Sequence, residues 1–414
     1  MICHDIVIVG GGPAGMAAAI AAYDAGCTDV VVLDRENDMG GILRQCIHAG
    51  FGLHKLGREL TGPEYADVYK QEVLKREIKV YYETMVTAVS PDRVVTARNR
   101  EGILKIQAKA VVLAMGCRER SRGALNTPGT RPAGVYSAGT AQKLINCDGY
   151  MVGKRVVILG SGDIGLIMAR RMSLEGAKVE AVCELLPYSG GLTRNIVQCL
   201  EDFGIPLYLS TTVVQIHGEK RLEGVTVAQV DENRRPIEET KRFIPCDTLL
   251  LSVGLIPENE LTRSAGIPMD PITGGAMVDQ NCMTQVPGIF ACGNVLHVHD
   301  LVDYVSEEAE RAGIGAADFV RGSAGSENTL TTQAGHGVRY VVPQQLSCDS
   351  GEVSLFLRVT QPFGKVKFTV TSAGQVLATA KRLKAAPGEM ERIPLKPEQL
   401  ALARDTITVS LEEL

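Results

Sequence analysis

The chain has 414 residues, of which 45% are hydrophobic and 22% charged, and its net charge is −5 at pH 7. This length favours two or three domains with apolar cores. A mildly acidic chain without a Lys/Arg block is an unlikely partner for nucleic acid, and no apolar run approaches the roughly 20 residues of a membrane span. The eleven cysteines are scattered and never spaced as CxxC, which favours reduced thiols. We therefore expect a soluble cytoplasmic protein.

The first motif is a glycine loop at the N-terminus. The segment IVIVGGGPAG places Gly10, Gly12 and Gly15 in a GxGxxG pattern, between an apolar β-branched run and a helix of small residues. Asp34 follows 19 residues after Gly15, at the end of the apolar segment VVVLDR. In a dinucleotide site these glycines allow a tight turn, close approach to a pyrophosphate and helix–strand packing, and the acid accepts hydrogen bonds from a ribose.

The segment GGILRQCIHAGFG follows and contains Cys46 and His48. One interpretation makes them a proton donor and acceptor or a charge-transfer thiolate, since histidine exchanges protons near neutral pH. The alternative is a buried cysteine and a structural histidine. Cys117 and Cys147, further along, are more typical of packed small side chains than of redox centres.

The glycine pattern repeats 150 residues later. RVVILGSGDIG carries Gly160, Gly162 and Gly165, and Glu184 again lies 19 residues after the third glycine. Two complete units predict two dinucleotide sites on parallel, doubly wound sheets. A carboxylate at the position of Glu184 favours NAD(H), because NADP(H) prefers a nearby arginine. Positions 183–187 read CELLP, although Arg194 follows within reach of a loop.

The segment after the second unit ends in DTLLLSVGLIPEN, and then PGIFACGN predicts a strand and a Gly293-Asn294 turn. Helical spacing predicts a helix from about Val302 to Val320. His297, His299 and Asp300 could be interpreted as metal ligands. Alternating histidines without further ligands are usually structural, so we expect no metal. On the helix, acidic and basic residues are typical of a solvated face: Glu307, Glu308, Glu310 and Arg311.

A linker rich in Gly, Ser, Asn and Thr marks a boundary near residues 322–332. Beyond it, apolar residues alternate with polar ones from Val353 to Val359, from Val366 to Val370 and from Ile407 to Leu411. This period of two predicts a small antiparallel β domain with one buried face. It carries no chemical motif.

These motifs, in this order, resemble the flavoproteins of the pyridine nucleotide-disulfide oxidoreductase superfamily over about residues 1–325. In that family the first loop holds FAD, an inserted unit holds NAD(P)H, and the chain then returns to complete the FAD domain. The resemblance implies an α/β fold with two nested Rossmann-like domains. The expected parts are an FAD domain at 1–119 and 255–325, an NAD domain at 120–254 and a C-terminal β domain at 326–414.

LAMG and SVGLIPE look like the closing strands of the family, and IFACGN looks like its late flavin motif. Asn294 replaces the usual acid there, and its amide can still accept from a ribityl hydroxyl. The helix that follows would direct backbone N–H groups at the flavin. The FAD contacts implied are Gly10, Gly12, Pro13, Ala14, Gly15, Asp34, Arg35, Gly41, Ile42, Leu43, Val86, Ala114, Gly116, Gly293, Asn294 and Val305. The NAD contacts implied are Gly160, Gly162, Asp163, Ile164, Glu184 and Gly254.

The sequence departs from the family at both known dithiol positions. Leu43 and His48 stand where a CxxxxC pair would fall, and Leu144 stands three residues before Cys147, where a CxxC pair would fall. Thiol–disulfide exchange needs a resolving partner for the attacking thiol. We therefore do not expect a disulfide reductase.

GGILRQCIHAGFGLH and RPAGVYSAGTAQ are similar to a subgroup with the FAD/NAD-binding subunits of opine oxidases and hydrogen cyanide synthase. The subgroup also includes a flavoprotein encoded beside glycerol-3-phosphate dehydrogenase. This resemblance implies hydride transfer between NAD(H) and FAD, coupled to a partner dehydrogenase acting on a small alcohol or amine of glycerol 3-phosphate type. Two alternatives stay open: a stand-alone NADH oxidase or diaphorase, and a non-catalytic FAD-bearing scaffold subunit.

Overall fold

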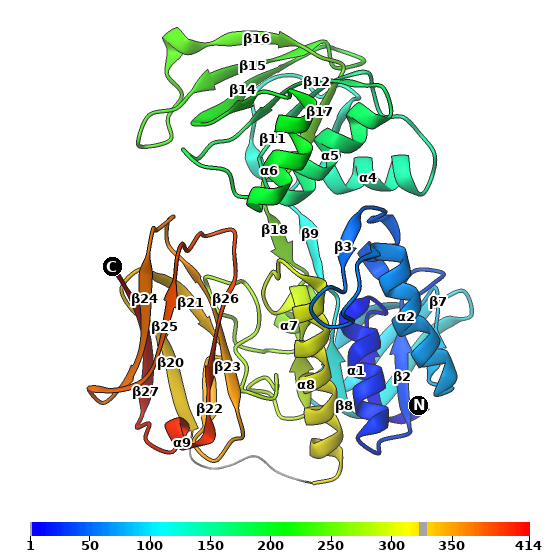
Figure 1. Ribbon diagram of the computed structural model, residues 1–414. Coiled ribbons are helices and arrows are strands. Elements are labelled where there is room, and N and C mark those ends of the chain that lie inside the picture. The colour runs from blue at the N-terminus through cyan, green and yellow to red at the C-terminus, as the bar shows by residue number, and fades with distance from the viewer. Residues whose placement is uncertain (1, 323–328) are drawn as a thin grey trace. The chain divides into compact units, whose positions relative to one another are not determined.

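The computed structural model describes residues 2–322 and 329–414 (Figure 1). The chain divides into two compact units, one made of Met1–Cys117 with Pro257–Leu414 and the other of Arg118–Ile256. The first unit therefore contains the C-terminal residues as well as the first glycine loop. The division into four parts at residues 119, 254 and 325 stays a prediction, and the expected linker falls partly on residues outside the described ranges.

A seven-stranded sheet organises the first unit, in the order β5–β2–β1–β8–β7–β6, with β19 also paired to β8. The pairs β5–β2, β2–β1, β1–β8 and β8–β19 are parallel, whereas β6 and β7 form an antiparallel extension. The strands are β1 (Ile2–Val9), β2 (Val30–Leu33), β5 (Lys79–Tyr81), β6 (Met85–Val89), β7 (Val94–Asn99), β8 (Gly102–Leu113) and β19 (Ile289–Ala291).

Helices α1 (Pro13–Asp24), α2 (Gly62–Lys75) and α8 (Val302–Val320) bury their apolar residues against Ile6, Ile8 and the side chains that share their face of the sheet. Val7 and Val9 point to a separate core on the opposite face. This alternation explains why the parallel strands are apolar throughout. α1 and α8 run side by side (Figure 1). A Cβ added at Gly313 would lie 2.2 Å from the Ala18 carbonyl oxygen, so this close approach requires glycine.

The second unit contains a parallel five-stranded sheet, β10–β17–β11–β12–β13, and an antiparallel sheet, β14–β15–β16. The first consists of β10 (Val135–Ser137), β17 (Thr248–Leu251), β11 (Arg155–Leu159), β12 (Lys178–Cys183) and β13 (Leu207–Tyr208). The second consists of β14 (Thr211–His217), β15 (Gly224–Gln229) and β16 (Arg242–Pro245). Its main helices are α4 (Ala138–Asn146), α5 (Asp163–Leu174) and α6 (Thr193–Cys199).

The C-terminal residues form two sheets around one apolar core, β22–β20–β27–β24–β25 and β21–β23–β26. The strands are β20 (Thr329–Ala334), β21 (Val338–Val342), β22 (Gln345–Ser347), β23 (Val353–Val359), β24 (Val366–Ser372), β25 (Gln375–Arg382), β26 (Glu391–Leu395) and β27 (Thr406–Glu413). The sheets are antiparallel as predicted, except that β20 and β27 pair in parallel. Alternation in the sequence shows which face is buried but does not show which strands become neighbours.

Short elements connect these parts: η1 (Gly41–Gln45), β3 (Ala49–Phe51), β4 (Leu60–Thr61), β9 (Cys117–Glu119), α3 (Arg122–Leu125), η2 (Glu201–Phe203), η3 (Glu238–Thr240), β18 (Leu255–Pro257), α7 (Glu260–Ser264), η4 (Gly293–Val295) and α9 (Pro397–Leu400). Within the described ranges, every helix is too short or too polar to cross a membrane.

Candidate dinucleotide-binding sites

The first glycine loop joins β1 to α1 through a turn that only glycine permits. Gly10 has φ of +105°, and a Cβ there would lie 2.5 Å from the Ala114 carbonyl oxygen. A Cβ at Gly15 would lie 1.7 Å from the Gly10 carbonyl oxygen. Helix α1 begins at Pro13, and its N-cap, Gly12, offers no side-chain cap. The backbone N–H groups at this helix start are thus directed at the space above the loop, as a phosphate requires.

Asp34 is buried beside this loop. One carboxylate oxygen accepts the N–H of Gly11 at 2.6 Å and the other accepts the N–H of Glu36 at 2.8 Å. Burial raises the pKa of Asp34, while these two hydrogen bonds oppose the rise. Because a carboxylate has about four acceptor positions, both oxygens keep capacity for a ribose hydroxyl. Arg35, the next predicted contact, is exposed and lies 4.0 Å from Glu36.

The segment that begins at Gly40 lies opposite the first glycine loop. The glycine loop and this segment form the two walls of a cradle. The N–H of Gly40 donates to the Gly11 carbonyl at 2.9 Å, and a Cβ at Gly41 would lie 3.1 Å from the Cα of Gly12. A Cβ at Gly12 would meet nothing closer than 4.0 Å. The two loops therefore approach each other closely at Gly12 and Gly41, neither of which carries a side chain, and this suits a pyrophosphate.

The predicted side chains around that wall differ in burial. Ile42 is exposed and Leu43 is buried. The Sγ atom of Cys46 donates to the Ile42 carbonyl at 3.3 Å, and the ring of His48 lies 5.1 Å from that of Phe51. The structure thus places Cys46 and His48 directly after the cradle wall.

The carboxyl end of the sheet supplies the remaining predicted FAD contacts. Ala114 donates its N–H to Val9 at 2.9 Å, and Gly116 borders open space. A Cβ at Gly293 would lie 2.8 Å from Ala14 and 3.3 Å from Val305, so these three residues meet. Val86, in contrast, packs in the core on the far face of the sheet together with Val9.

The side-chain amide of Asn294 makes hydrogen bonds that stabilise the loop in which it lies. Its oxygen accepts the N–H of His299 at 3.0 Å, and its nitrogen donates to the Cys117 sulfur at 3.6 Å. The amide predicted to face a ribityl chain thus shapes the turn, and it keeps one further acceptor position on its oxygen and one further N–H on its nitrogen.

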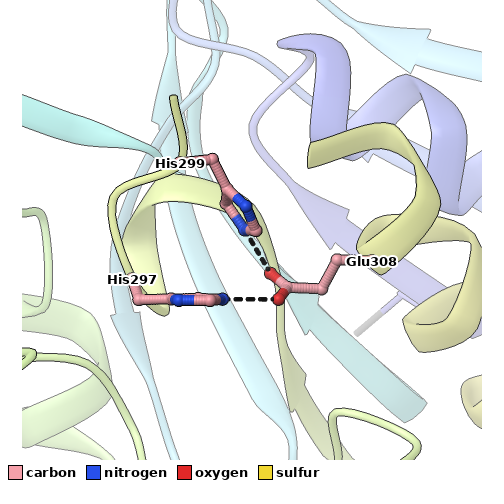
Figure 2. A group of neighbouring side chains, drawn as sticks. All are labelled: His297, His299 and Glu308. Carbon is pink, nitrogen blue, oxygen red and sulfur yellow. Dashed lines mark hydrogen bonds and ion pairs between the residues drawn. The ribbon is translucent and has the colours of Figure 1, made fainter. Parts of the chain in front are cut away.

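Glu308 corrects the expectation of a solvated helix face, because its side chain is 1% exposed. It accepts hydrogen bonds from the Gly293 N–H at 2.7 Å and from the imidazoles of His297 and His299 (Figure 2). Burial opposes ionisation, but His299 and His297 outweigh it and hold the pKa of Glu308 well below its usual range. Burial lowers the pKa of His297, although Glu308 counteracts this. Glu308 lies three residues after Val305 and four before Ala312, and so belongs to the buried stripe of α8.

The second glycine loop repeats the first in the other unit. A Cβ at Gly160 would lie 2.0 Å from the Ser252 carbonyl oxygen, and one at Gly165 would lie 2.7 Å from the Gly160 carbonyl oxygen. α5 begins at Asp163 after Gly162, again without a side-chain cap. Beyond the strand that follows, Gly254 has φ of +103° and borders open space.

Glu184 is buried and bound to the second loop. One of its oxygens accepts from both the N–H and the hydroxyl of Ser161, at 2.8 and 2.7 Å, and the other accepts from the Leu186 N–H at 2.9 Å. Asp163 turns toward a neighbouring segment and accepts from the Leu192 N–H at 2.8 Å and the Asn195 side chain at 2.7 Å. Ile164, the next residue of α5, is half-buried and packs against the core of this unit.

Sequence reasoning missed Arg242, a cation that packs on Tyr208, the residue whose backbone pairs with Glu184. The guanidinium carbon of Arg242 lies 4.4 Å from the ring centre of Tyr208, and the Tyr208 carbonyl accepts the Glu184 N–H at 2.9 Å. No local spacing could reveal this, because β16 reaches the end of β12 only through the fold.

All eleven cysteines are free thiols. Leu43 is buried at one dithiol position, and Cys147 is exposed at the other. Burial raises the pKa of the Cys183 and Cys246 thiols to about 12 and that of Cys199 to about 11. These buried thiols are therefore unreactive side chains of the core.

A glycine loop, a helix start and an acid, repeated in two units, define the class of flavoproteins with two dinucleotide-binding folds. A model of the pyridine nucleotide-disulphide oxidoreductase family matches residues 4–316, and the chain belongs to that family. Members of the family bind FAD and use NAD(P)H. The glycine cradles and the uncapped helix starts of this chain fit both groups.

Two curated relatives are parts of larger enzymes by name. The chain is 26% identical over 321 residues to the opine oxidase A chain of Agrobacterium tumefaciens (strain Ach5), which is named as a subunit, and the match covers 70% of this chain and 61% of that protein. It is 29% identical over 285 residues to the hydrogen cyanide synthase subunit HcnB of Pseudomonas aeruginosa, covering 63% and 59%. The matches thus span about three fifths of each relative's length.

Among solved structures, thioredoxin reductase of T. acidophilum matches with a TM-score of 0.64 at 24% identity, over 77% of this chain and 99% of that one. At this identity the similarity establishes the fold alone.

Proposed function

We propose that this protein is an FAD-dependent oxidoreductase that exchanges a hydride between NAD(H) and its flavin. The observation that carries the proposal is the paired arrangement of Asp34 with Gly11 and of Glu184 with Ser161, one in each compact unit. The free thiols favour a reducing compartment, and we place the protein in the cytoplasm.

FAD would be held by the first unit. The residues proposed to contact it are those of the cradle and of the sheet's carboxyl end: Gly10, Gly12, Pro13, Ala14, Gly15, Asp34, Gly41, Ile42, Leu43, Ala114, Gly116, Gly293, Asn294 and Val305. Bound FAD would accept or donate the hydride. The protein's own contribution is to orient the cofactor and exclude water, since the redox chemistry belongs to the flavin.

NAD(H) would be held by the second unit, at Gly160, Gly162, Asp163, Ile164, Glu184 and Gly254. Glu184 is a hydrogen-bond acceptor next to the loop and would repel a 2′-phosphate. Arg242 brings a positive charge to the neighbouring Tyr208 ring, and so a comparison of NADH with NADPH tests which charge governs the choice.

For Cys46 and His48 we propose a role in proton exchange during flavin reduction. The proposal is supported by their position directly after the Gly40–Gly41 wall. A His48→Gln variant should shift the pH profile of flavin reduction while retaining FAD. An unchanged profile would assign His48 a structural role.

The electrons would be exchanged with a partner dehydrogenase that oxidises a small alcohol or amine, of glycerol 3-phosphate type. Two observations support this partner. The opine oxidase relative and HcnB are both named as subunits, and neither dithiol position of this chain holds a cysteine pair. We therefore propose that an internal disulfide is not the second redox partner.

Mixing the purified protein with NADH under anaerobic conditions tests the proposal. The flavin absorbance should bleach rapidly, and denaturation should release FAD rather than FMN, because the acid beside the first loop serves an adenosine ribose. A flavin that NADH leaves oxidised would indicate a scaffold role without catalysis. Rapid oxygen consumption by the isolated chain would indicate a stand-alone oxidase, and co-purification from the native host identifies the partner.

A further inference from the structure

Three buried side chains converge where the loop before α8 meets the helix (Figure 2). The Nε2 atom of His297 lies 2.7 Å from one oxygen of Glu308, and the Nε2 atom of His299 lies 3.2 Å from the other. All three side chains are at most 1% exposed. Their potential ligand atoms all lie within 4.8 Å of one another. Two imidazoles and a carboxylate thus face one small volume.

This cluster buries a carboxylate without a permanent cation. In the described part of the chain, the ion pairs of Glu308 are those with His297 and His299, and a histidine is a cation only when protonated. Burying an ionised carboxylate is costly unless positive charge accompanies it. A dication bound between the three side chains would supply that charge.

Among the described residues, no hydrogen bond to the second ring nitrogen fixes the tautomer of His297 or His299. The Nδ1 atoms of His297 and His299 are buried, and neither has a hydrogen-bond partner among the described residues. Moving each ring proton from Nε2 to Nδ1 would therefore break no other hydrogen bond and would present both Nε2 lone pairs to a metal. The rings of Tyr340 and Phe356 lie 6.2 and 6.0 Å from His297, steeply inclined to it. An aromatic face is a weak acceptor for such an N–H group.

We propose that His297, His299 and Glu308 form a binding site for a first-row transition-metal dication such as Zn²⁺. Imidazole with carboxylate is a donor set for these metals, whereas Mg²⁺ and Ca²⁺ prefer oxygen alone. Zinc–ligand distances of about 2.0–2.2 Å place the ligand atoms of a tetrahedral ion about 3.4 Å apart. The two nitrogen–oxygen separations of 2.7 and 3.2 Å, which run to different oxygens of Glu308, would open by less than 1 Å, and every pair of potential ligand atoms lies within 4.8 Å.

One residue of the cluster, Glu308, also lies at a cavity. This cavity has a volume of about 110 Å³ and is also lined by Cys282, Arg311 and Phe356. A cavity of this size can hold water, and one water molecule would complete a four-coordinate site.

The metal would connect α8 to the turn at Gly293–Val295. Glu308 also accepts the Gly293 N–H at 2.7 Å, and the His299 N–H donates to Asn294 at 3.0 Å. We infer a structural ion that stabilises this turn. Its effect on FAD rests on the proposed function, because the turn belongs to the proposed FAD site, but the metal site itself does not.

The test uses the full-length chain without a polyhistidine tag, grown with added Zn²⁺. Elemental analysis should find about one ion per chain, and the chelator-treated protein should bind Zn²⁺ with about 1:1 stoichiometry in calorimetry. His297→Ala and Glu308→Gln should each lose the ion. His336→Ala is the matched control and should keep it, because His336 is an exposed histidine in the same unit.

Wild-type protein that contains no metal and binds none in the titration would overturn the site, and this result needs no variant to fold. An ion that both variants retain, or X-ray absorption that shows sulfur ligands, would place the metal elsewhere and overturn it as well. FAD release and NADH reduction are measured on the same preparations. A metal-free protein with normal flavin reduction would overturn only this inference and leave the proposed function standing.

Discussion

The two glycine loops have the same local geometry, but the segments that face them make different contacts. In each, an acid 19 residues beyond the third glycine accepts the N–H of the residue after the first glycine, Gly11 in one loop and Ser161 in the other. Both helices start without a side-chain cap. The same local geometry therefore arises twice from sequences that share few residues outside the motif.

The difference lies in what faces the loop. In the first unit, Gly40 and Gly41 approach backbone to backbone, with a Gly40–Gly11 hydrogen bond of 2.9 Å. In the second, a Cβ at Gly191 would likewise lie 2.9 Å from the Ser161 carbonyl oxygen, but side chains make the hydrogen bonds: Asp163 accepts from Leu192, and the Ser161 hydroxyl donates to Glu184. We infer that a backbone-walled cradle suits a permanently held cofactor, whereas side chains that can rearrange suit a nucleotide that must exchange.

Replacing the third glycine of each loop by alanine should give the largest difference between the two loops. Gly15→Ala places a methyl group 1.7 Å from backbone, while Gly165→Ala meets backbone at 2.7 Å and the movable Ser252 side chain at 2.8 Å. Overpacking costs about 1–3 kcal/mol when neighbours can adjust, and the Gly10 carbonyl that faces Gly15 belongs to the backbone of the turn and cannot. We expect Gly15→Ala to lose most FAD and lower the melting temperature, and Gly165→Ala to keep its FAD. Equal losses in both variants would contradict the comparison.

Replacing Asp34 or Glu184 by alanine should have smaller effects, and each substitution should weaken the binding of a different cofactor. Glu184→Ala should weaken NADH binding by about 1–3 kcal/mol, the cost of losing a buried hydrogen-bonded charge, with unchanged flavin content. Asp34→Ala should reduce FAD retention instead, because Gly11 and Glu36 lose their acceptor. Flavin absorbance per chain and NADH titration separate the two effects. A wild-type protein that reacts much faster with NADPH than with NADH would contradict the role assigned to Glu184.

Cysteine substitutions should have the smallest effect, because neither unit holds a thiol pair at the known dithiol positions. Cys46→Ser and Cys147→Ser should each leave the rate of flavin reduction by NADH within about tenfold of wild type, since no resolving thiol is present. Stopped-flow absorbance at the flavin band measures this. A loss of reduction in both variants would show that distant cysteines meet during turnover, whereas a loss in Cys46→Ser alone would point to its proposed role in proton exchange.

Local pattern predicted much of this fold. Helix α8 has the bounds that its spacing indicated, Val302–Val320, and each glycine loop leads from a strand into a helix. These features depend on residues close in sequence, whose periodicity reports local backbone geometry.

The features that escaped prediction depend on tertiary contacts. Glu308 is charged, and only its position three residues after Val305 hinted that it faces the core. Because Glu308 is charged, the sequence analysis placed it on the solvated face and did not group it with His297 and His299 as a potential metal ligand. Arg242, which lies on β16, reaches the Tyr208 ring on β13. A single sequence contains no spacing that reports such contacts.

Because the chain has no cysteine pair at the known dithiol positions, we expect NADH to reduce the flavin and no second redox centre. An anaerobic titration with NADH, followed at the flavin band, measures its capacity directly. We predict an endpoint at about two electrons per FAD, the capacity of the flavin alone. An endpoint at about four electrons with a stable thiolate–flavin absorbance band, abolished in Cys46→Ser or Cys147→Ser, would contradict the account and return the protein to the disulfide reductases.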